Sequence, residues 1–335
     1  MPFHIYQWSE IGPVLQPQSS ILLGNGASIA VDQRFHYRSL LEYAQQYGLL
    51  SADVQRLFQF FGTDDFELIL RIVWQATNVN SSLQIPDNRT RVAYLNVREA
   101  LIRAVRAIHA EHDEVAAHIP PIYEFLKPFE TVLSLNYDLI IYWAMMYGSD
   151  VPDRHSFKDC FIHGTFQDNW FDFREPIYGD TSTTLVFYPH GSLILARNKV
   201  EEELKLTRHD QDDLLESVLH AWETEQVVPL FVSEGTSEQK VNSIHGSYYL
   251  SRVHREVLQT IRNDLVIYGF GFWEHDRHIL ERLGASMIQR LFISVYEYDQ
   301  AYCNRVHQVV REYFRPGVKI YFFDSNSPGC WNNVA

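Results

Sequence analysis

The chain has 335 residues and is 46% hydrophobic, which is enough to bury the core of one large or two modest domains. Its 42 acidic and 28 basic side chains give a formal net charge of -14, which argues against nucleic acid as a primary ligand. No apolar run approaches the roughly 20 residues that cross a bilayer, and the N-terminus lacks the features of a signal peptide, so we expect a cytoplasmic protein without membrane association.

Cysteine and histidine spacing gives no sign of a metal site. Cys160, Cys303 and Cys330 are far apart and odd in number, which argues against a disulfide framework and a four-cysteine zinc module. His275 and His278 stand three apart on an expected helix, a spacing more typical of a solvated helix face than of a metal site. We therefore expect no metal.

The first expected strand, residues 20–23, runs into a glycine turn, Gly24-Asn25-Gly26-Ala27-Ser28, before a helix around residues 40–43. Such a turn would let exposed backbone amides approach a pyrophosphate closely. Ile29 stands where the dinucleotide fingerprint Gly-x-Gly-x-x-Gly has its third glycine, so a conventional dehydrogenase is not indicated. A tight turn without a ligand is the alternative.

Two segments differ in character from the rest of the chain. Residues 51–118 have helical periodicity and predict a helical insertion. Residues 148–182 are irregular and rich in aromatic side chains, which favours a lid or an interface over a simple connector.

The stretch 131–138 is the most informative in the sequence. A buried strand over residues 131–135 ends in Asn136 and Asp138, and an almost wholly apolar helix follows from residue 139. Ligands of open α/β sheets bind at the carboxyl ends of strands, so these two side chains indicate a site. The alternative is that one of them caps the helix.

Two His-Gly pairs compete as the source of a functional imidazole. His190 and Gly191 lie between a strand at 184–188 and its expected partner or continuation at 192–197, and His163 is followed by Gly164. A small neighbour leaves room for a ligand, although a histidine at a turn is more often an ordinary surface residue.

The C-terminal third alternates strands with helices. Expected strands cover residues 227–232, 265–268, 291–295 and 318–322; the first leads into a polar loop, 233–240, that could cap a helix or line a pocket. The second opens into Gly269-Phe270-Gly271, and the third ends at Glu297, whose carboxylate could accept hydrogen bonds from ribose hydroxyls. Alternation of this kind predicts an α/β fold with a parallel sheet covered on both faces.

Taken together, the two glycine turns, Asn136-Tyr-Asp138 and a His-Gly pair resemble the sirtuin-like NAD-binding clan over residues 20–325. The resemblance implies one Rossmann-like domain over residues 1–335, like that of sirtuins and deoxyhypusine synthase. The missing Cys-x-x-Cys pairs exclude the zinc ribbon of the deacylases, and the helical segment is similar to insertions of bacterial defence proteins that cleave NAD.

The same resemblance implies a role for each site residue. Asn136 would orient a water molecule, His190 would act as base or hold the ribose (with His163 as the rival), and Asp138 would support Asn136. Residues of the two glycine turns would hold the pyrophosphate, and Glu297 would contact ribose; these turn residues are Gly24, Asn25, Gly26, Ala27, Ser28, Gly269, Phe270 and Gly271.

The expected function is therefore an NAD hydrolase of antiphage defence. We expect NAD to be its substrate. We also expect the protein to form a homo-oligomer or to assemble with a partner protein of a defence system. A catalytically silent NAD or ADP-ribose sensor and an ADP-ribosyl transferase stay open as alternatives.

Overall fold

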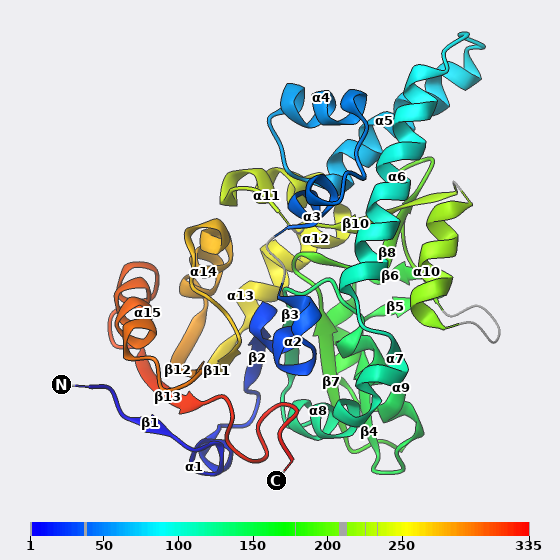
Figure 1. Cartoon of the computed structure of the whole chain (residues 1–335). Helices are drawn as coiled ribbons and strands as arrows, with labels where there is room; N and C mark the ends of the chain where they lie inside the picture. The colour runs from blue at the N-terminus through cyan, green and yellow to red at the C-terminus, as the bar shows by residue number, and fades with distance from the viewer. Residues whose placement is uncertain are drawn as a thin grey trace.

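An eight-stranded sheet, in which every neighbouring pair of strands is parallel, forms the centre of the molecule (Figure 1). The computed structural model describes residues 2–36, 39–177, 179–207, 213–224, 226–232 and 234–334. From edge to edge the strands are β1 (Ile5–Tyr6), β13 (Lys319–Asp324), β12 (Met287–Val295), β11 (Arg262–Tyr268), β2 (Ser20–Leu23), β3 (Thr131–Ser134), β7 (Ser182–Phe187) and β4 (His155–Lys158). The predicted parallel α/β sheet is confirmed.

The central strands carry no alternation of apolar and polar residues, because helices flank the sheet. Every residue of β2 and β3 is buried, as is typical of parallel strands covered on both faces. The helices that connect the strands are α2 (Asn25–Val31), α3 (Leu40–Gln46), α8 (Ile119–Leu126), α9 (Ile140–Asp150), α14 (Arg277–Gly284) and α15 (Gln300–Tyr313).

Strand order reverses at β2. From β2 the chain adds β3, β4 and β7 on one side, and it later returns to add β11, β12 and β13 on the other. The connections that follow β2 and β11 therefore lead to strands on opposite sides, β3 and β12, and the carboxyl ends of these strands border a crevice of the kind in which α/β proteins bind ligands.

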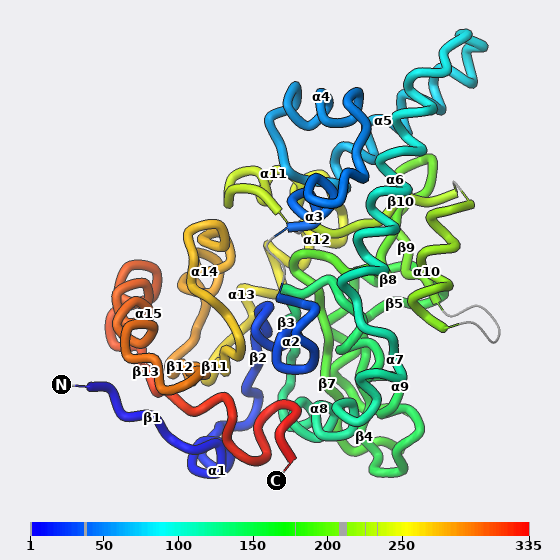
Figure 2. Tube along the Cα trace, in the orientation of Figure 1, coloured from blue at the N-terminus to red at the C-terminus, as the bar shows by residue number. Residues whose placement is uncertain are grey.

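Residues 51–118 are helical, as expected. The segment contains α4 (Ala52–Phe61), α5 (Phe66–Ser82), α6 (Arg89–Ile108) and α7 (His112–Val115). Helices α5 and α6 pack against each other and extend away from the sheet, with their connecting turn at the far end (Figures 1 and 2).

A second, smaller sheet corrects one expectation. Strand β8 (Gly191–Asn198) neither continues nor pairs with β7; it pairs antiparallel with β9 (Glu203–Lys205) and β10 (Val227–Phe231). The turn at Tyr188–Gly191, closed by the Gly191 N–H on the Tyr188 carbonyl (2.9 Å), directs β8 out of the main sheet.

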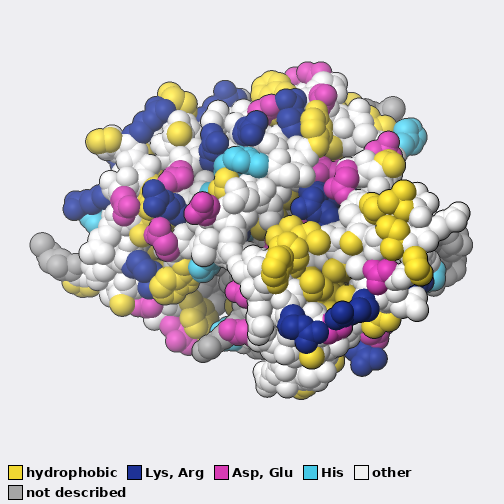
Figure 3. Space-filling view, turned by 90° about the horizontal axis from the view of Figure 1, so that it is seen from above, with side chains coloured by type: hydrophobic (Ala, Val, Ile, Leu, Met, Phe, Trp, Pro, Cys, Tyr) yellow, Lys and Arg dark blue, Asp and Glu magenta, His cyan; other side chains and the backbone are white. Residues whose placement is uncertain are grey.

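The aromatic segment 148–182 is more regular than its sequence indicates. It contributes β4 to the edge of the main sheet, a hairpin of β5 (Phe161–Ile162) and β6 (Thr165–Phe166), and a 3-10 turn at Trp170–Arg174. Among the described residues, no helix is long and apolar enough to cross a bilayer. On the face in Figure 3, basic and acidic side chains are interspersed rather than gathered into a basic stripe.

Candidate functional site

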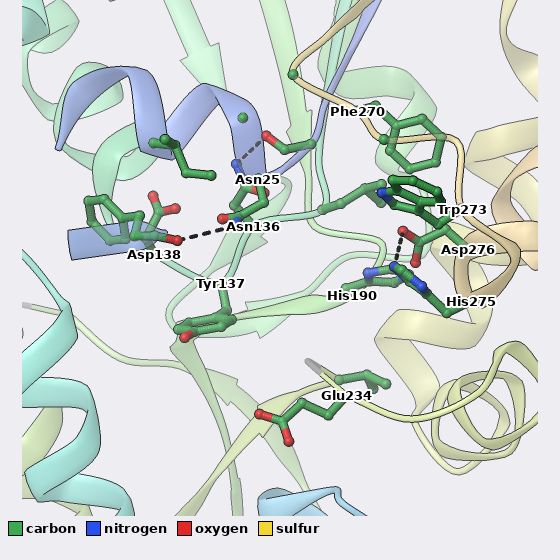
Figure 4. A pocket seen from close by; sticks show the side chains of 18 of the residues that line it. Asn25, Asn136, Tyr137, Asp138, His190, Glu234, Phe270, Trp273, His275 and Asp276 are labelled. Atoms are coloured by element: carbon green, nitrogen blue, oxygen red, sulfur yellow. Dashed lines mark hydrogen bonds and ion pairs between the residues drawn. The ribbon is translucent and has the colours of Figure 1, made fainter. Parts of the chain in front are cut away.

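A cavity of about 450 Å³ lies at the point where the strand order reverses (Figure 4). We call it the switch-point cavity. Its walls come from the loops after β2, β3 and β11, from the β7–β8 turn, and from the segment between β10 and α11 (Ser237–His245). The lining includes Gly24, Asn25, Gly26, Asn136, Tyr137, Asp138, His190, Glu234, Lys240, Gly269, Phe270, Gly271, Trp273, His275 and Asp276.

The two glycine turns pack directly on each other. The N–H groups of Gly24 and Gly26 donate to the carbonyls of Tyr268 (2.9 Å) and Gly269 (2.8 Å). A Cβ on Gly24 would lie 2.6 Å from the Gly269 oxygen, and one on Gly269, whose φ is +67°, would lie 2.3 Å from the Ala27 nitrogen. Glycine is required here because the two loops touch.

This packing engages several of the backbone amides that were expected to approach a pyrophosphate. The amides of Gly24 and Gly26 are engaged with the neighbouring loop, and that of Ala27 donates to the Gly24 carbonyl (2.9 Å). Ala27 and Ser28 are buried beneath the cavity rather than part of its lining. Within the described residues, the turn retains the N–H of Asn25 as an amide without an acceptor.

Asn136 is held in one orientation. Its Nδ2 donates to the Gly24 carbonyl (3.0 Å) and to Ser28 Oγ (2.9 Å), so both amide hydrogens are used. No group in the described ranges donates to Oδ1. Asn136, which follows the end of β3, therefore presents a fixed hydrogen-bond acceptor to the cavity.

Asp138 combines the two roles that the sequence left open. Its carboxylate accepts the N–H of Ile140 (3.0 Å) near the start of α9 and also accepts the Ser28 hydroxyl. Burial raises the pKa of this carboxyl. Asp138 thus fixes Ser28, which in turn holds Asn136.

The structure brings His190 to the cavity. Its imidazole is buried, and Nε2 lies 2.9 Å from Nε2 of His278. Burial lowers the pKa of His190 well below its usual value, so the ring is neutral. Gly191 has a φ of +78°, and its Cβ would lie 2.3 Å from the Leu230 oxygen, so glycine is needed here for contact with β10 and not to make room for a ligand.

Two predicted site residues lie elsewhere. His163 and Gly164, with φ of +49° and +80°, form the two-residue turn of the β5–β6 hairpin, where two positive φ values are characteristic. Glu297 has a φ of +50° and is exposed after β12. Neither lines the cavity, so the structure does not bring them to Asn136.

The sequence did not single out three charged residues of the cavity. Lys240 Nζ lies 2.8 Å from Asp276 Oδ1, and both side chains are largely buried, so the pair is close to neutral overall. Burial raises the pKa of Glu234 to about 8. The only signal was the polar loop 233–240 after a strand; Ser233 itself lies outside the described residues. His278, expected on a solvated face, is buried.

Residues 21–331 match the family described as a domain of unknown function, DUF4917. The chain belongs to this family. Among curated proteins, no match was found. In the described part of the chain, no group of three or more His, Cys, Asp or Glu side chains is arranged to hold a metal ion. The function of this DUF4917 protein must therefore be argued from the cavity itself.

Proposed function

We propose that the protein hydrolyses NAD to nicotinamide and ADP-ribose in the switch-point cavity. The proposal is supported by the resemblance to the sirtuin-like clan and by the place of the cavity at the reversal of strand order, where α/β proteins bind nucleotides. The observation that carries it is the locked amide of Asn136, whose Oδ1 is left as an acceptor at the end of β3.

A fixed acceptor suits the chemistry of this bond. Cleavage of the bond between nicotinamide and ribose passes through an oxocarbenium-like state, and nicotinamide departs as a neutral molecule. The protein has to place one water molecule beside C1′ and exclude the rest. An amide oxygen accepts a hydrogen bond from that water and orients it without deprotonating it.

The neutral imidazole of His190 supplies the base. As the water oxygen bonds to C1′, it must lose one proton, and His190 lines the same cavity as Asn136. NAD and water thus become nicotinamide, ADP-ribose and one proton. For the pyrophosphate, the lining offers the N–H of Asn25 and the ammonium group of Lys240 as donors.

We expect Asn136→Ala to lower turnover by about 100-fold or more, on the order of 3 kcal/mol, because the variant loses an interaction made in the transition state. Nicotinamide release measures turnover, and calorimetry measures NAD affinity, which should change little. Asn304→Ala is the matched control, since Asn304 is exposed on α15 and donates only to the Gln300 carbonyl. Near-normal turnover of Asn136→Ala would sink the proposal.

The two alternatives give different results with the unaltered protein. A sensor binds NAD and releases no nicotinamide. An ADP-ribosyl transferase moves label from adenylate-labelled NAD onto a macromolecule instead of into free ADP-ribose. Both use the same cavity, and no feature of its geometry favours either over hydrolysis.

A further inference from the structure

Three side chains form a continuous hydrogen-bonded chain behind the switch-point cavity. His190 Nε2 lies 2.9 Å from His278 Nε2, and the two rings are stacked with centroids 5.1 Å apart. His278 Nδ1 lies 3.1 Å from Ser237 Oγ, which also accepts the backbone N–H of His278 (3.1 Å). The second contact fixes the hydroxyl beside the ring.

This chain joins two neighbouring cavities, and His275 lines both of them. His190 lines the switch-point cavity, whereas His278 and Ser237 line another of about 770 Å³, which we call the outer cavity. The outer cavity lies between the start of α11 and α14, and apart from Val241 its other lining residues are polar, among them Thr236, Glu238, Glu274 and Arg277. His278 therefore lies between His190, which lines the cavity that holds Asn136, and a solvated surface.

We propose that His278 and Ser237 form a proton relay that sets the tautomer of His190 and carries the proton released in the switch-point cavity to the outer cavity. The inference rests on the proposed function for the origin of that proton. The hydrogen-bonded chain itself does not depend on it.

The relay can be described by the position of each proton before and during turnover. Before turnover, His190 carries hydrogen on Nε2 and an open lone pair on Nδ1, and His278 carries hydrogen on Nδ1. When the attacking water gives a proton to His190 Nδ1, the Nε2 hydrogen passes to His278 Nε2. The Nδ1 hydrogen of His278 then passes to Ser237 Oγ, and the hydroxyl releases its own hydrogen to water. Exchange with solvent at both ends restores the first state.

The groups around the two imidazole rings favour a concerted movement of protons over an imidazolium ion held on either ring. The groups that face the two rings are Lys240 on α11, His254 in the π-helical segment Val253–Val257, and His275 and Asp276 in the turn before α14. Burial lowers the pKa of His278 to about 2, and Lys240 and the other histidines add to the effect while Asp276 opposes it. Neither ring holds an imidazolium charge at rest, so protons have to move along the chain together.

Kinetics provide the first test. His278→Gln retains hydrogen-bonding groups but cannot pass a proton from one ring atom to the other, so we expect kcat to fall about 10- to 100-fold with KM unchanged. Added imidazole should restore part of the rate through the outer cavity. Ser237→Ala should also lose rate, and Ser237→Thr should keep it, because the hydroxyl is retained.

His254→Gln is the matched control. This buried histidine has its ring centroid 6.0 Å from that of His278 but lies beside the chain and not in it. Its kcat should stay near that of the unaltered protein. A His278→Gln variant with normal kcat, or a loss that His254→Gln shares, would overturn the relay.

The second test needs no turnover. Nitrogen NMR of labelled histidine distinguishes ring nitrogens with and without hydrogen, and we expect Ser237→Ala to change the tautomer populations of His190, which Ser237 does not touch. Unchanged His190 signals in that variant would overturn the relay. If the unaltered protein released no nicotinamide, hydrolysis would fail as the proposed function, and the NMR result alone would decide whether the three side chains are coupled.

Discussion

Glu234 is the side chain of the cavity whose protonation state we expect to affect NAD binding. Its Oε1 accepts the Leu40 N–H, while Oε2 is buried with no donor among the described residues. Because burial raises the pKa to about 8, the carboxyl keeps its proton at neutral pH, and its ionisation would place an unpaired negative charge in the cavity wall. We expect NAD affinity to fall roughly tenfold as the pH rises from 7 to 9, since that charge repels the anionic pyrophosphate.

Glu234→Gln checks this expectation, because an amide stays neutral at every pH. Calorimetric titrations of NAD across this range should show no pH dependence for the variant, and Glu238→Gln, an exposed position in the same segment, should behave like the unaltered protein. Parallel curves for all three proteins would mean that ionisation of Glu234 does not affect NAD binding.

The difference between Asn136 and Glu234 explains which site residues a sequence can reveal. Asn136 directly follows a buried apolar strand, and parallel strands align their carboxyl ends, so its place near the glycine turns could be inferred. Glu234 follows β10, which lies in the separate antiparallel sheet, and it reaches the cavity only through tertiary packing. The polar loop 233–240 indicated a helix cap or a pocket lining, but no local pattern assigned Glu234 to this cavity.

At the level of the elements, contact between the loops after β2 and β11 makes a specific demand on Gly269. We expect Gly269→Ala to destabilise the protein by about 3 kcal/mol or more, because a clash with the Ala27 nitrogen adds to the strain of a positive φ. Gly48 has a similar φ of +63° with nothing within 4 Å of its Cβ position, so Gly48→Ala should cost only ~1 kcal/mol. Urea unfolding measures both.

Equal losses of unfolding free energy in the two variants would mean that the loops after β2 and β11 separate easily. Their close approach would then not be needed for stability. The sequence predicted a glycine turn after each strand and left a pyrophosphate site and a tight turn without a ligand open; after β2 the expected turn is instead the start of α2. Glycines that let two loops touch and glycines that let a loop touch a ligand occupy the same positions after a strand in the sequence. Only the strand order distinguishes the two cases, and the sequence does not show which strands are neighbours. The two His-Gly pairs were ambiguous for the same reason.

Across the whole molecule, α3 and the helical segment are joined to the cavity wall by polar contacts, of which the one to Glu234 is buried. Ser243 donates to Asp65 Oδ2 (3.1 Å), Gln239 Nε2 donates to the Gly62 carbonyl (2.9 Å), and Glu234 accepts from Leu40. Burial raises the pKa of Asp65, and it raises that of nearby Glu67 to about 8. The junction between α5 and the β10–α11 segment thus concentrates carboxyl groups that resist ionisation.

This junction makes the stability of the protein depend on pH, and Glu67 allows the effect to be isolated. Its pKa in the folded state lies above its ordinary value of 4.5 because burial dominates and Arg71, 3.9 Å away, does not offset it. The folded state therefore binds more protons than the unfolded state between pH 4.5 and 8, so its stabilising proton is fully present below this interval and is lost as the pH rises through it.

We expect the free energy of unfolding to fall by up to about 1.4 kcal/mol per pH unit from this group across the interval. Glu67→Gln cannot ionise, so its slope should be shallower and the variant should be the more stable protein at pH 8. Urea unfolding from pH 5 to 8 measures both slopes. Glu99→Gln, on the exposed face of α6 beside Arg103, should keep the slope of the unaltered protein. If Glu67→Gln kept that slope as well, the carboxyl would already be ionised and solvated at neutral pH, and α5 would have to pack less tightly against β10 than the buried position of Glu67 requires.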